Sequence, residues 1–155
     1  MASNSTSAGA NYGGGSMSGR ILAVDPGEKR IGIAVSDPTG TIANPLTVIN
    51  HKARAVDAAR IVQIAQENKV TKIIVGCPFD MEGEMGPQAR KSARIAEAIR
   101  TQTNLPVELW DESGSTQEAR AARILLGVRK SKRTGHMDDL AATYILQTYL
   151  DSISS

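Results

Sequence analysis

Short apolar runs separated by turn residues fill the first third of the chain. The run 20–25 ends in a Pro-Gly pair, and a second run, 31–37, follows a charged turn. Because apolar runs joined by so few residues are typical of hairpins, we expect two antiparallel strands. A third run, 41–49, extends the pattern. Pro45 within it indicates an edge or bulged strand, since proline cannot donate a ladder hydrogen bond.

The remaining two thirds alternate between helical and strand periodicity. In chain order the pattern predicts a helix whose apolar stripe covers 55–65 and which ends near residue 68, then strand 72–77, helix 89–99, strand 106–111, helix 116–126 and helix 138–150. Three meandering strands followed by alternating helix and strand predict an α/β fold: a mixed sheet with helices on both faces.

Length and composition favour one domain behind a flexible tail. The chain has 155 residues, and residues 1–19 are almost entirely small and polar. Such a segment cannot bury enough apolar surface to order itself, so we expect a disordered tail and a single domain over 20–152. No apolar stretch reaches the ~18 residues of a membrane span, and Cys77 is the single cysteine. We therefore expect a soluble, reduced, cytoplasmic protein.

Two strand ends carry carboxylates that are candidates for chemistry. Asp25 closes the first strand where the backbone turns away through Pro-Gly, a position open to a metal or phosphate and also ordinary for a turn. Asp111 and Glu112 end the strand after the second long helix. Because neighbouring strand residues point to opposite faces, only one of this pair can share the face of Asp25.

The last helix offers two further acidic residues. With about 100° between residues, Asp138 falls in the middle of the apolar stripe formed by Ala141, Ala142, Ile145 and Tyr149. Asp139 lies about a quarter turn away, toward Thr143 and Leu150. Either carboxylate also suits the positive end of a helix. A carboxylate centred on an apolar stripe must nevertheless be paired, protonated or bound to a cation, because burial of a free charge is costly.

Carboxylates from two strand ends and one helix can converge on a single cation site. Their mutual repulsion would make such a cluster unstable without a divalent ion. Oxygen ligands favour Mg²⁺ or Mn²⁺, and the sequence has no His or Cys cluster to suggest zinc. A site of this kind suits phosphoryl transfer, in which metal ions activate a water and stabilise the leaving oxygen.

Six segments together resemble a known family. They are Val-Asp-Pro-Gly-Glu-Lys-Arg-Ile-Gly-Ile-Ala-Val-Ser-Asp at 24–37, Val-Gly-Cys-Pro-Phe at 75–79, Asp-Met-Glu-Gly at 80–83, Gly-Pro-Gln-Ala-Arg at 86–90, Trp-Asp-Glu at 110–112 and Asp-Asp-Leu-Ala-Ala-Thr-Tyr-Ile-Leu-Gln at 138–147. In this order they resemble the YqgF family over nearly all of residues 20–150. Members of that family are known as Holliday junction resolvases and as nucleases that trim the precursor of small-subunit ribosomal RNA.

The resemblance implies a fold, a reaction and a set of site residues. It implies a ribonuclease H-like fold similar to that of RuvC, and a metal-dependent hydrolase of phosphodiester bonds acting on structured RNA or branched DNA. The catalytic and metal-binding carboxylates would be Asp25, Glu112 and Asp138. The chain departs from the family at 113–116, where Ser-Gly-Ser-Thr replaces the usual Arg-Leu-Ser/Thr-Thr. It therefore lacks the phosphate or carboxylate contact which that arginine would make.

Basic residues cluster near the expected site although the net charge is only +2. The residues that we expect to contact nucleic acid are Lys29, Arg30, Arg90, Lys91, Arg129, Lys130, Lys132 and Arg133. A cationic rim around an acidic centre is what a nuclease that binds the phosphate backbone requires. Aromatic residues are few, so base stacking is not expected to dominate binding.

Two other functions fit parts of the pattern. The Asp-Pro-Gly turn is also compatible with the phosphate loop of an actin- or sugar-kinase-like ATPase, but those proteins enclose nucleotide between two lobes, and this chain is too short for two. A non-catalytic RNA-binding or ribosome-assembly factor could retain the fold, and the departure at 113–116 favours it, whereas the three retained carboxylates disfavour it. Ribosome precursors are an expected partner, and the protein is expected to be a monomer or a homodimer.

Overall fold

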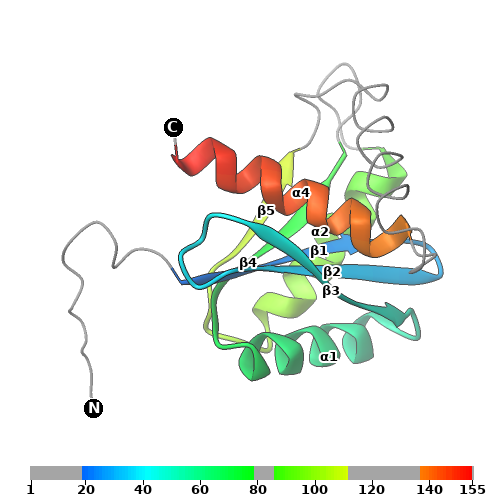
Figure 1. Cartoon of the computed structure of the whole chain (residues 1–155). Coiled ribbons are helices and arrows are strands. Elements are labelled where there is room, and N and C mark those ends of the chain that lie inside the picture. Colours follow the sequence, from blue (N-terminus) through cyan, green and yellow to red (C-terminus); the bar gives the residue numbers. More distant parts are fainter. Residues whose placement is uncertain (1–18, 79–85, 112–136, 155) are drawn as a thin grey trace, which may run out of the picture.

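A single five-stranded sheet forms the centre of the molecule (Figure 1). The computed structural model describes residues 19–78, 86–111 and 137–154, the last of these with side chains from residue 140 onward. The strands are β1 (Arg20–Pro26), β2 (Arg30–Ser36), β3 (Ala43–Asn50), β4 (Val70–Cys77) and β5 (Val107–Asp111). The helices are α1 (Arg54–Glu67), α2 (Pro87–Arg100) and α4 (Met137–Ser154).

The sheet is mixed, as the sequence predicts. Its strand order is β3-β2-β1-β4-β5, with β1 in the centre. β1 pairs with β2 in antiparallel and with β4 in parallel fashion, and β4 pairs with β5 in parallel fashion. The carboxyl ends of the three parallel strands β1, β4 and β5 therefore lie side by side along the same end of the sheet. In open α/β sheets this carboxyl-terminal edge is where ligands bind.

The interpretation of Pro45 is confirmed in both respects. β3 is an edge strand, and its register with β2 shifts between Ile33, which faces Thr47, and Ala34, which faces Pro45. One residue of β3 is therefore left over at the proline. That residue is Leu46, so the irregular pairing lies beside the proline, whose nitrogen cannot donate a ladder hydrogen bond.

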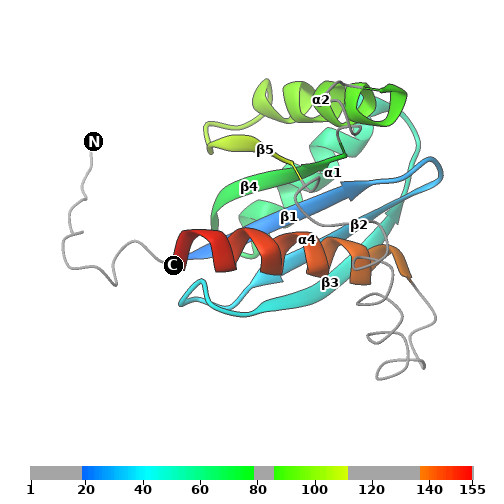
Figure 2. The same cartoon turned by 90° about the horizontal axis from the view of Figure 1, so that it is seen from above.

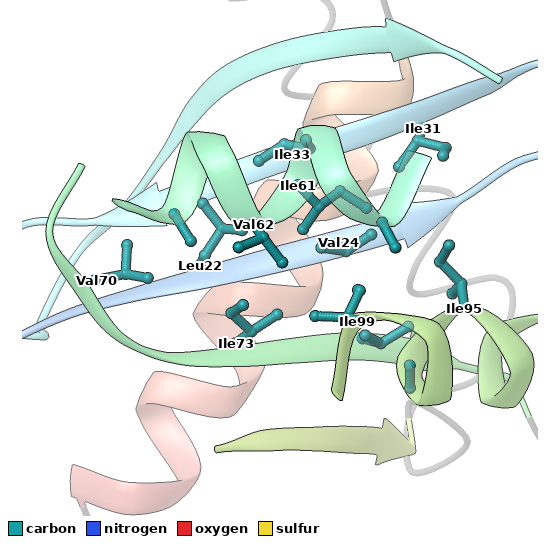
Figure 3. Close-up of a cluster of buried hydrophobic side chains, with 14 of the residues drawn as sticks. Leu22, Val24, Ile31, Ile33, Ile61, Val62, Val70, Ile73, Ile95 and Ile99 are labelled. Atoms are coloured by element: carbon teal, nitrogen blue, oxygen red, sulfur yellow. The ribbon is translucent and has the colours of Figure 1, made fainter. Parts of the chain in front are cut away.

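Helices cover both faces of the sheet (Figure 2). Leu22 and Val24 of β1 belong to the cluster packed under α1 and α2, which Figure 3 shows, whereas Ile21 and Ala23 pack with α4 on the opposite face. This alternation follows from the two-residue period of a strand. Both faces of β1 are buried from Ile21 to Val24, so these four residues before Asp25 are all apolar.

Most predicted element boundaries agree with the structure to within a few residues. The exception is the last helix, which continues to Ser154, beyond the predicted end at residue 150. The hydroxyls of Ser152 and Ser154 donate hydrogen bonds to carbonyls of the preceding turn, which lets polar residues extend the helix. The predicted helix 116–126 and all but the last residue of the predicted tail 1–19 lie outside the described residues. Within the described parts, no helix is both long and apolar enough to cross a membrane.

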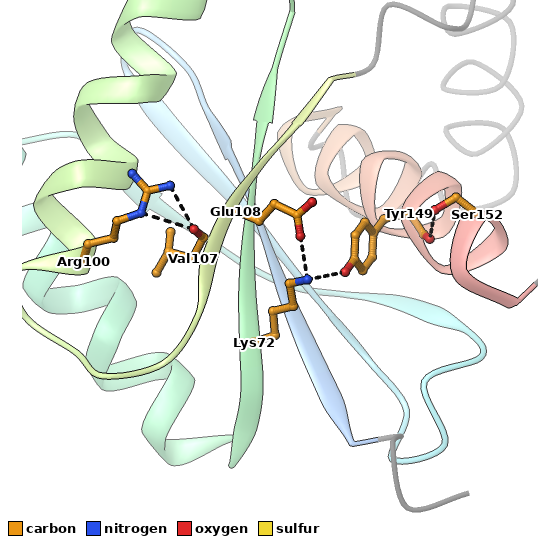
Figure 4. A network of polar contacts seen from close by, with 6 residues as sticks. All are labelled: Lys72, Arg100, Val107, Glu108, Tyr149 and Ser152. Carbon is orange, nitrogen blue, oxygen red and sulfur yellow. Dashed lines mark hydrogen bonds and ion pairs between the residues drawn. The ribbon is translucent and has the colours of Figure 1, made fainter. Parts of the chain in front are cut away.

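A polar network anchors the second half of α4 to the sheet (Figure 4). The ammonium of Lys72 on β4 lies 2.5 Å from a carboxylate oxygen of Glu108 on β5 and donates to the Tyr149 hydroxyl at 2.6 Å. Partial burial lowers the pKa of Lys72, but these two contacts outweigh burial and raise its pKa overall. Beside them, the Trp110 indole donates to the Thr148 hydroxyl at 2.9 Å. These contacts fix the rotation of α4 about its own axis.

Removing the Tyr149 hydroxyl tests this anchor. We expect Tyr149→Phe to lower the free energy of unfolding by about 1 kcal/mol, because the ring still packs while one charge-assisted hydrogen bond is lost. Urea unfolding would measure it, in a double-mutant cycle with Lys72→Met. If the two substitutions were additive, the hydroxyl and the ammonium would not be coupled, and the anchor would have to be assigned to packing alone.

Candidate active site

Asp25 lies at the carboxyl end of the central strand, on the face that α4 covers. It pairs with Gly32 of β2 and is half-buried. Ala23, two residues earlier, packs with α4, so by the strand period the side chain of Asp25 points to the same face. A carboxylate is thus presented at the end of an otherwise apolar strand.

The turn after Asp25 is tight enough to require glycine. The Gly27 amide donates to the Arg30 carbonyl at 2.9 Å, closing the turn between β1 and β2. A β-carbon added to Gly27 would lie 2.4 Å from that same carbonyl oxygen, well inside contact distance. The shape of this turn determines where β1 ends and hence where Asp25 stands.

Helix α2 holds the turn in place from the other face. The side-chain amide of Gln88 donates to the Pro26 carbonyl at 2.9 Å, and the ammonium of Lys91 donates to the Gly27 carbonyl at 2.6 Å. Lys91 was predicted from the sequence only as a contact for nucleic acid, and the structure gives it a bracing contact as well. The role of Gln88 was missed, although it stands within one of the six family segments.

The other predicted basic residues border the same turn where the structure describes them. Lys29 lies in the turn, Arg30 begins β2 and Arg90 lies in the first turn of α2, and all three are exposed. The Lys29 carbonyl accepts the His51 amide at 2.8 Å, which fixes the turn against the end of β3. The other four predicted contacts, Arg129, Lys130, Lys132 and Arg133, lie outside the described residues.

Asp111 at the end of β5 and Asp25 at the end of β1 lie on opposite faces of the sheet. Val107 and Leu109 pack toward α1 and α2, whereas Trp110 packs against the cluster under α4. Asp111, next to Trp110, therefore belongs to the face away from Asp25. Glu112, the predicted ligand, lies outside the described residues.

The buried stripe of α4 is wider than the sequence pattern suggests. Its buried positions are Ala141, Ala142, Ile145, Leu146, Tyr149 and Leu150. Leu150, which the sequence reading placed beside Asp139 and away from the stripe, is part of it, because the sheet offers α4 a broad surface across several strands. At about 100° per residue, position 138 lies about 30° from the centre of this stripe and position 139 about 70°. Position 138 therefore still lies nearer the centre of the buried stripe than position 139, but the difference between the two is smaller than the sequence pattern suggests.

The available donors fit a hard cation. Among the described side chains no three of His, Cys, Asp and Glu form a group that could hold a metal, but Glu112 and the carboxylate of Asp138 are not among them. Cys77 is fully buried. Its thiol faces the Ala89 carbonyl, 3.8 Å away. His51 is bound to Asp57 on the α1 side. Of the described carboxylates at the ends of β1 and β5, Asp25 lies on the α4 face, and its oxygen donors suit a hard cation such as Mg²⁺ or Mn²⁺.

Comparison with solved structures supports the topology. The Thermus thermophilus RuvC structure in complex with a Holliday junction superposes with a TM-score of 0.58 at 15% identity, over 88% of this chain and 97% of that one. The Fowlpox virus resolvase in complex with Holliday junction DNA gives a TM-score of 0.56 at 15% identity, over 88% and 99%. The fold is therefore the RuvC-like, ribonuclease H-like fold that the sequence predicts.

Sequence comparison assigns the family. A protein of Clostridium botulinum (strain Hall) named "Putative pre-16S rRNA nuclease" is 41% identical over 87% of this chain and 98% of its own length. A Thermoanaerobacter pseudethanolicus protein of the same name is 44% identical over 86% and 96%. The family RuvX, described as Holliday junction resolvase, matches residues 19–152. The chain therefore belongs to the RuvX family, the one that the resemblance to YqgF indicated.

Proposed function

We propose that this protein is a metal-dependent endonuclease that cleaves structured nucleic acid, with precursor small-subunit ribosomal RNA as its substrate. Hydrolysis of phosphodiester bonds follows from its family. The observation that carries the assignment to a site is the position of Asp25, at the carboxyl end of the central strand and on the face covered by α4. We propose Asp25, Glu112 and Asp138 as the metal ligands and catalytic carboxylates.

The lengths of β1 and α4 support the pairing of Asp25 with Asp138. Tyr149 is bonded to Lys72, whose partner on β1 is Ile21. In both overall views α4 begins at the end of the sheet where β1 finishes (Figures 1 and 2). Asp25 is four residues beyond Ile21, about 13 Å along a strand, and position 138 is eleven residues before Tyr149, about 16 Å along a helix. Asp25 and position 138 therefore lie at similar distances along the sheet from the Lys72–Tyr149 contact.

The parity of β5 supports Glu112 as the third ligand. Trp110 packs on the α4 side, so Asp111, the next residue of β5, lies on the face away from Asp25 and is disfavoured as a ligand. The choice between the two members of the pair, which the sequence left open until the family resemblance, therefore favours Glu112.

The roles of the residues follow from charge and position. A bound Mg²⁺ or Mn²⁺ would supply an activated water and neutralise charge on the phosphate. Asp25, with Glu112 and Asp138, would bind that cation, and the Gly27 turn with its braces Gln88 and Lys91 would hold Asp25 in register. The exposed Lys29, Arg30 and Arg90 would bind flanking phosphates without reading bases.

The choice of RNA as substrate follows the named relatives. Two relatives above 40% identity carry the name of a pre-16S rRNA nuclease, whereas the structures of resolvases bound to junctions share about 15% identity and support the fold. Holliday junction DNA is the other substrate to be tested. A cytoplasmic location and contact with ribosome precursors would follow from the RNA substrate.

A cleavage assay tests the proposal. The full chain is incubated with a precursor small-subunit rRNA fragment and with a four-way DNA junction, in Mg²⁺, in Mn²⁺ and in EDTA. We expect metal-dependent cleavage of the RNA that EDTA stops. Tight RNA binding without cleavage in either metal would instead identify a ribosome-assembly factor, the alternative that Ser113-Gly114 favours.

A further inference from the structure

A positively charged pocket lies on the opposite face of the sheet from Asp25. It has a volume of about 460 Å³ and opens between the first turn of α1, α2 and the turn after β1. Pro26 and Gly27 form part of its wall, so the same two residues separate it from the carboxylate of Asp25. Neither the family match nor the proposed reaction gives this pocket a role.

The lining of the pocket carries an excess of positive charge. Arg54, Lys91 and Arg94 line it together with His51 and one carboxylate, Asp57. Asp57 is 2% exposed and already accepts hydrogen bonds from the His51 ring and, at 3.0 Å, from the Lys52 amide. The lining therefore has three cations around one opening against one buried carboxylate, and the mutual repulsion of the cations favours the entry of a further anion.

These cations retain donors for a ligand. In the described part of the chain neither Arg54 nor Arg94 forms an ion pair. Lys91 donates one of its three ammonium hydrogens to the Gly27 carbonyl, which leaves two N–H donors for a ligand. Arginine presents several N–H groups in a plane, which suits the oxygens of a phosphate.

The placement of basic residues at two helix starts is unfavourable without an anion. Arg54 is the first residue of α1, whose first turn also contains Asp57, and Lys91 follows Arg90 in the first turns of α2, which has no acidic residue in its first turn. Cations at the positive end of a helix cost stability, typically a few tenths of a kcal/mol each. Neither α1 nor α2 has a side-chain cap, so amides at both helix starts also lack a side-chain acceptor. Both features favour a negatively charged ligand.

The floor of the pocket is apolar. Ile31 and Ile95 line it, and both lie at the same end of the buried cluster (Figure 3). A cationic rim above an apolar floor matches a phosphate joined to a sugar better than it matches a small inorganic anion. The volume lies within the range, roughly 300–1,000 Å³, of ordinary ligand pockets.

We propose that this pocket binds a backbone phosphate of the nucleic-acid substrate, on the side of the Pro26-Gly27 turn opposite to Asp25. The inference rests on the proposed function, because it assigns the pocket to the same substrate. The strand would pass around the carboxyl end of β1, with one phosphate at Arg54 and Arg94. Lys91 contacts both the pocket and the Gly27 carbonyl, so substrate in the pocket would touch the brace that positions Asp25.

Binding without cleavage tests the pocket separately from the reaction. Fluorescence anisotropy in EDTA would compare the full chain, the double variant Arg54→Ala/Arg94→Ala, and Arg60→Ala, an exposed arginine of α1 outside the pocket. The probe is a stem-loop RNA with a single-stranded flank. We expect the double variant to bind about 10-fold or more weakly, and the slope of log K against log salt to fall by about 1. Arg60→Ala should change neither quantity appreciably.

Two further readouts separate this role from a structural one and from a mononucleotide site. Thermal unfolding should show the double variant at least as stable as the wild type, because a cation is removed from a helix start. A nucleoside 5′-monophosphate should compete only weakly. Equal RNA binding by the double variant and Arg60→Ala would overturn the proposal, as would monophosphate binding tighter than RNA binding. Absent cleavage in metal with intact arginine-dependent binding would reject the nuclease assignment and leave the pocket standing.

Discussion

Replacing Asp25 with asparagine is expected to reduce metal-dependent cleavage by at least about a thousandfold, which corresponds to roughly 4 kcal/mol in the activation barrier. Asparagine keeps the shape of the side chain but removes the negative charge that a divalent cation requires. Single-turnover cleavage of the RNA substrate in Mg²⁺ would measure the effect. Asp25 is half-buried at a strand end and no core packing is removed, so the variant should remain folded.

The matched control is Glu67→Gln, which removes a carboxylate from the exposed last turn of α1 and should leave the cleavage rate unchanged. The same assay separates the two acidic residues of α4. Asp138→Asn should match the loss in Asp25→Asn, and Asp139→Asn should lose far less. More than a tenth of wild-type activity in Asp25→Asn would remove Asp25 from the metal site. Equal losses at 138 and 139 would mean that both carboxylates serve it.

The sheet and its helices could be predicted because their signals are local. Residues 21–24 of β1 are apolar on both faces and are followed by Asp-Pro-Gly, and each helix shows its stripe within its own residues. The position of Asp25 at the carboxyl end of its strand followed from this order of elements alone. The predicted end of α4 was less accurate, since the apolar stripe stops at Leu150, whereas Ser152 and Ser154 extend the helix by donating their hydroxyls to carbonyls of the preceding turn.

The contacts that hold the site were not predictable in the same way. Gln88 and Lys91 are about sixty residues from the carbonyls of Pro26 and Gly27 that they bind. No periodicity connects positions so far apart, and a glutamine in the first turn of a helix is ordinary on its own. The breadth of the α4 stripe likewise depended on the width of the sheet beneath it. Local pattern indicated which residues carry charge, and tertiary packing decided what those charges touch.

Replacing Gly27 with alanine should damage the site without removing any charged group. The added β-carbon would lie 2.4 Å from the Arg30 carbonyl oxygen, so the turn must open and weaken the Gly27 amide hydrogen bond. We expect a loss of about 2–4 kcal/mol in the free energy of unfolding, from steric strain plus one hydrogen bond. Urea unfolding would measure this loss.

Activity should fall further than stability explains. Asp25 stands two residues before Gly27, and a shift of about 1 Å in a catalytic group can cost about a hundredfold in rate. Gly86→Ala is the control, since a β-carbon there meets nothing within 4 Å and the residue caps the same helix that braces the turn. It should cost less than about 1 kcal/mol and leave cleavage intact. If Gly27→Ala remained folded and cleaved at the wild-type rate, the turn would not set the position of Asp25, and the braces from Gln88 and Lys91 would serve stability alone.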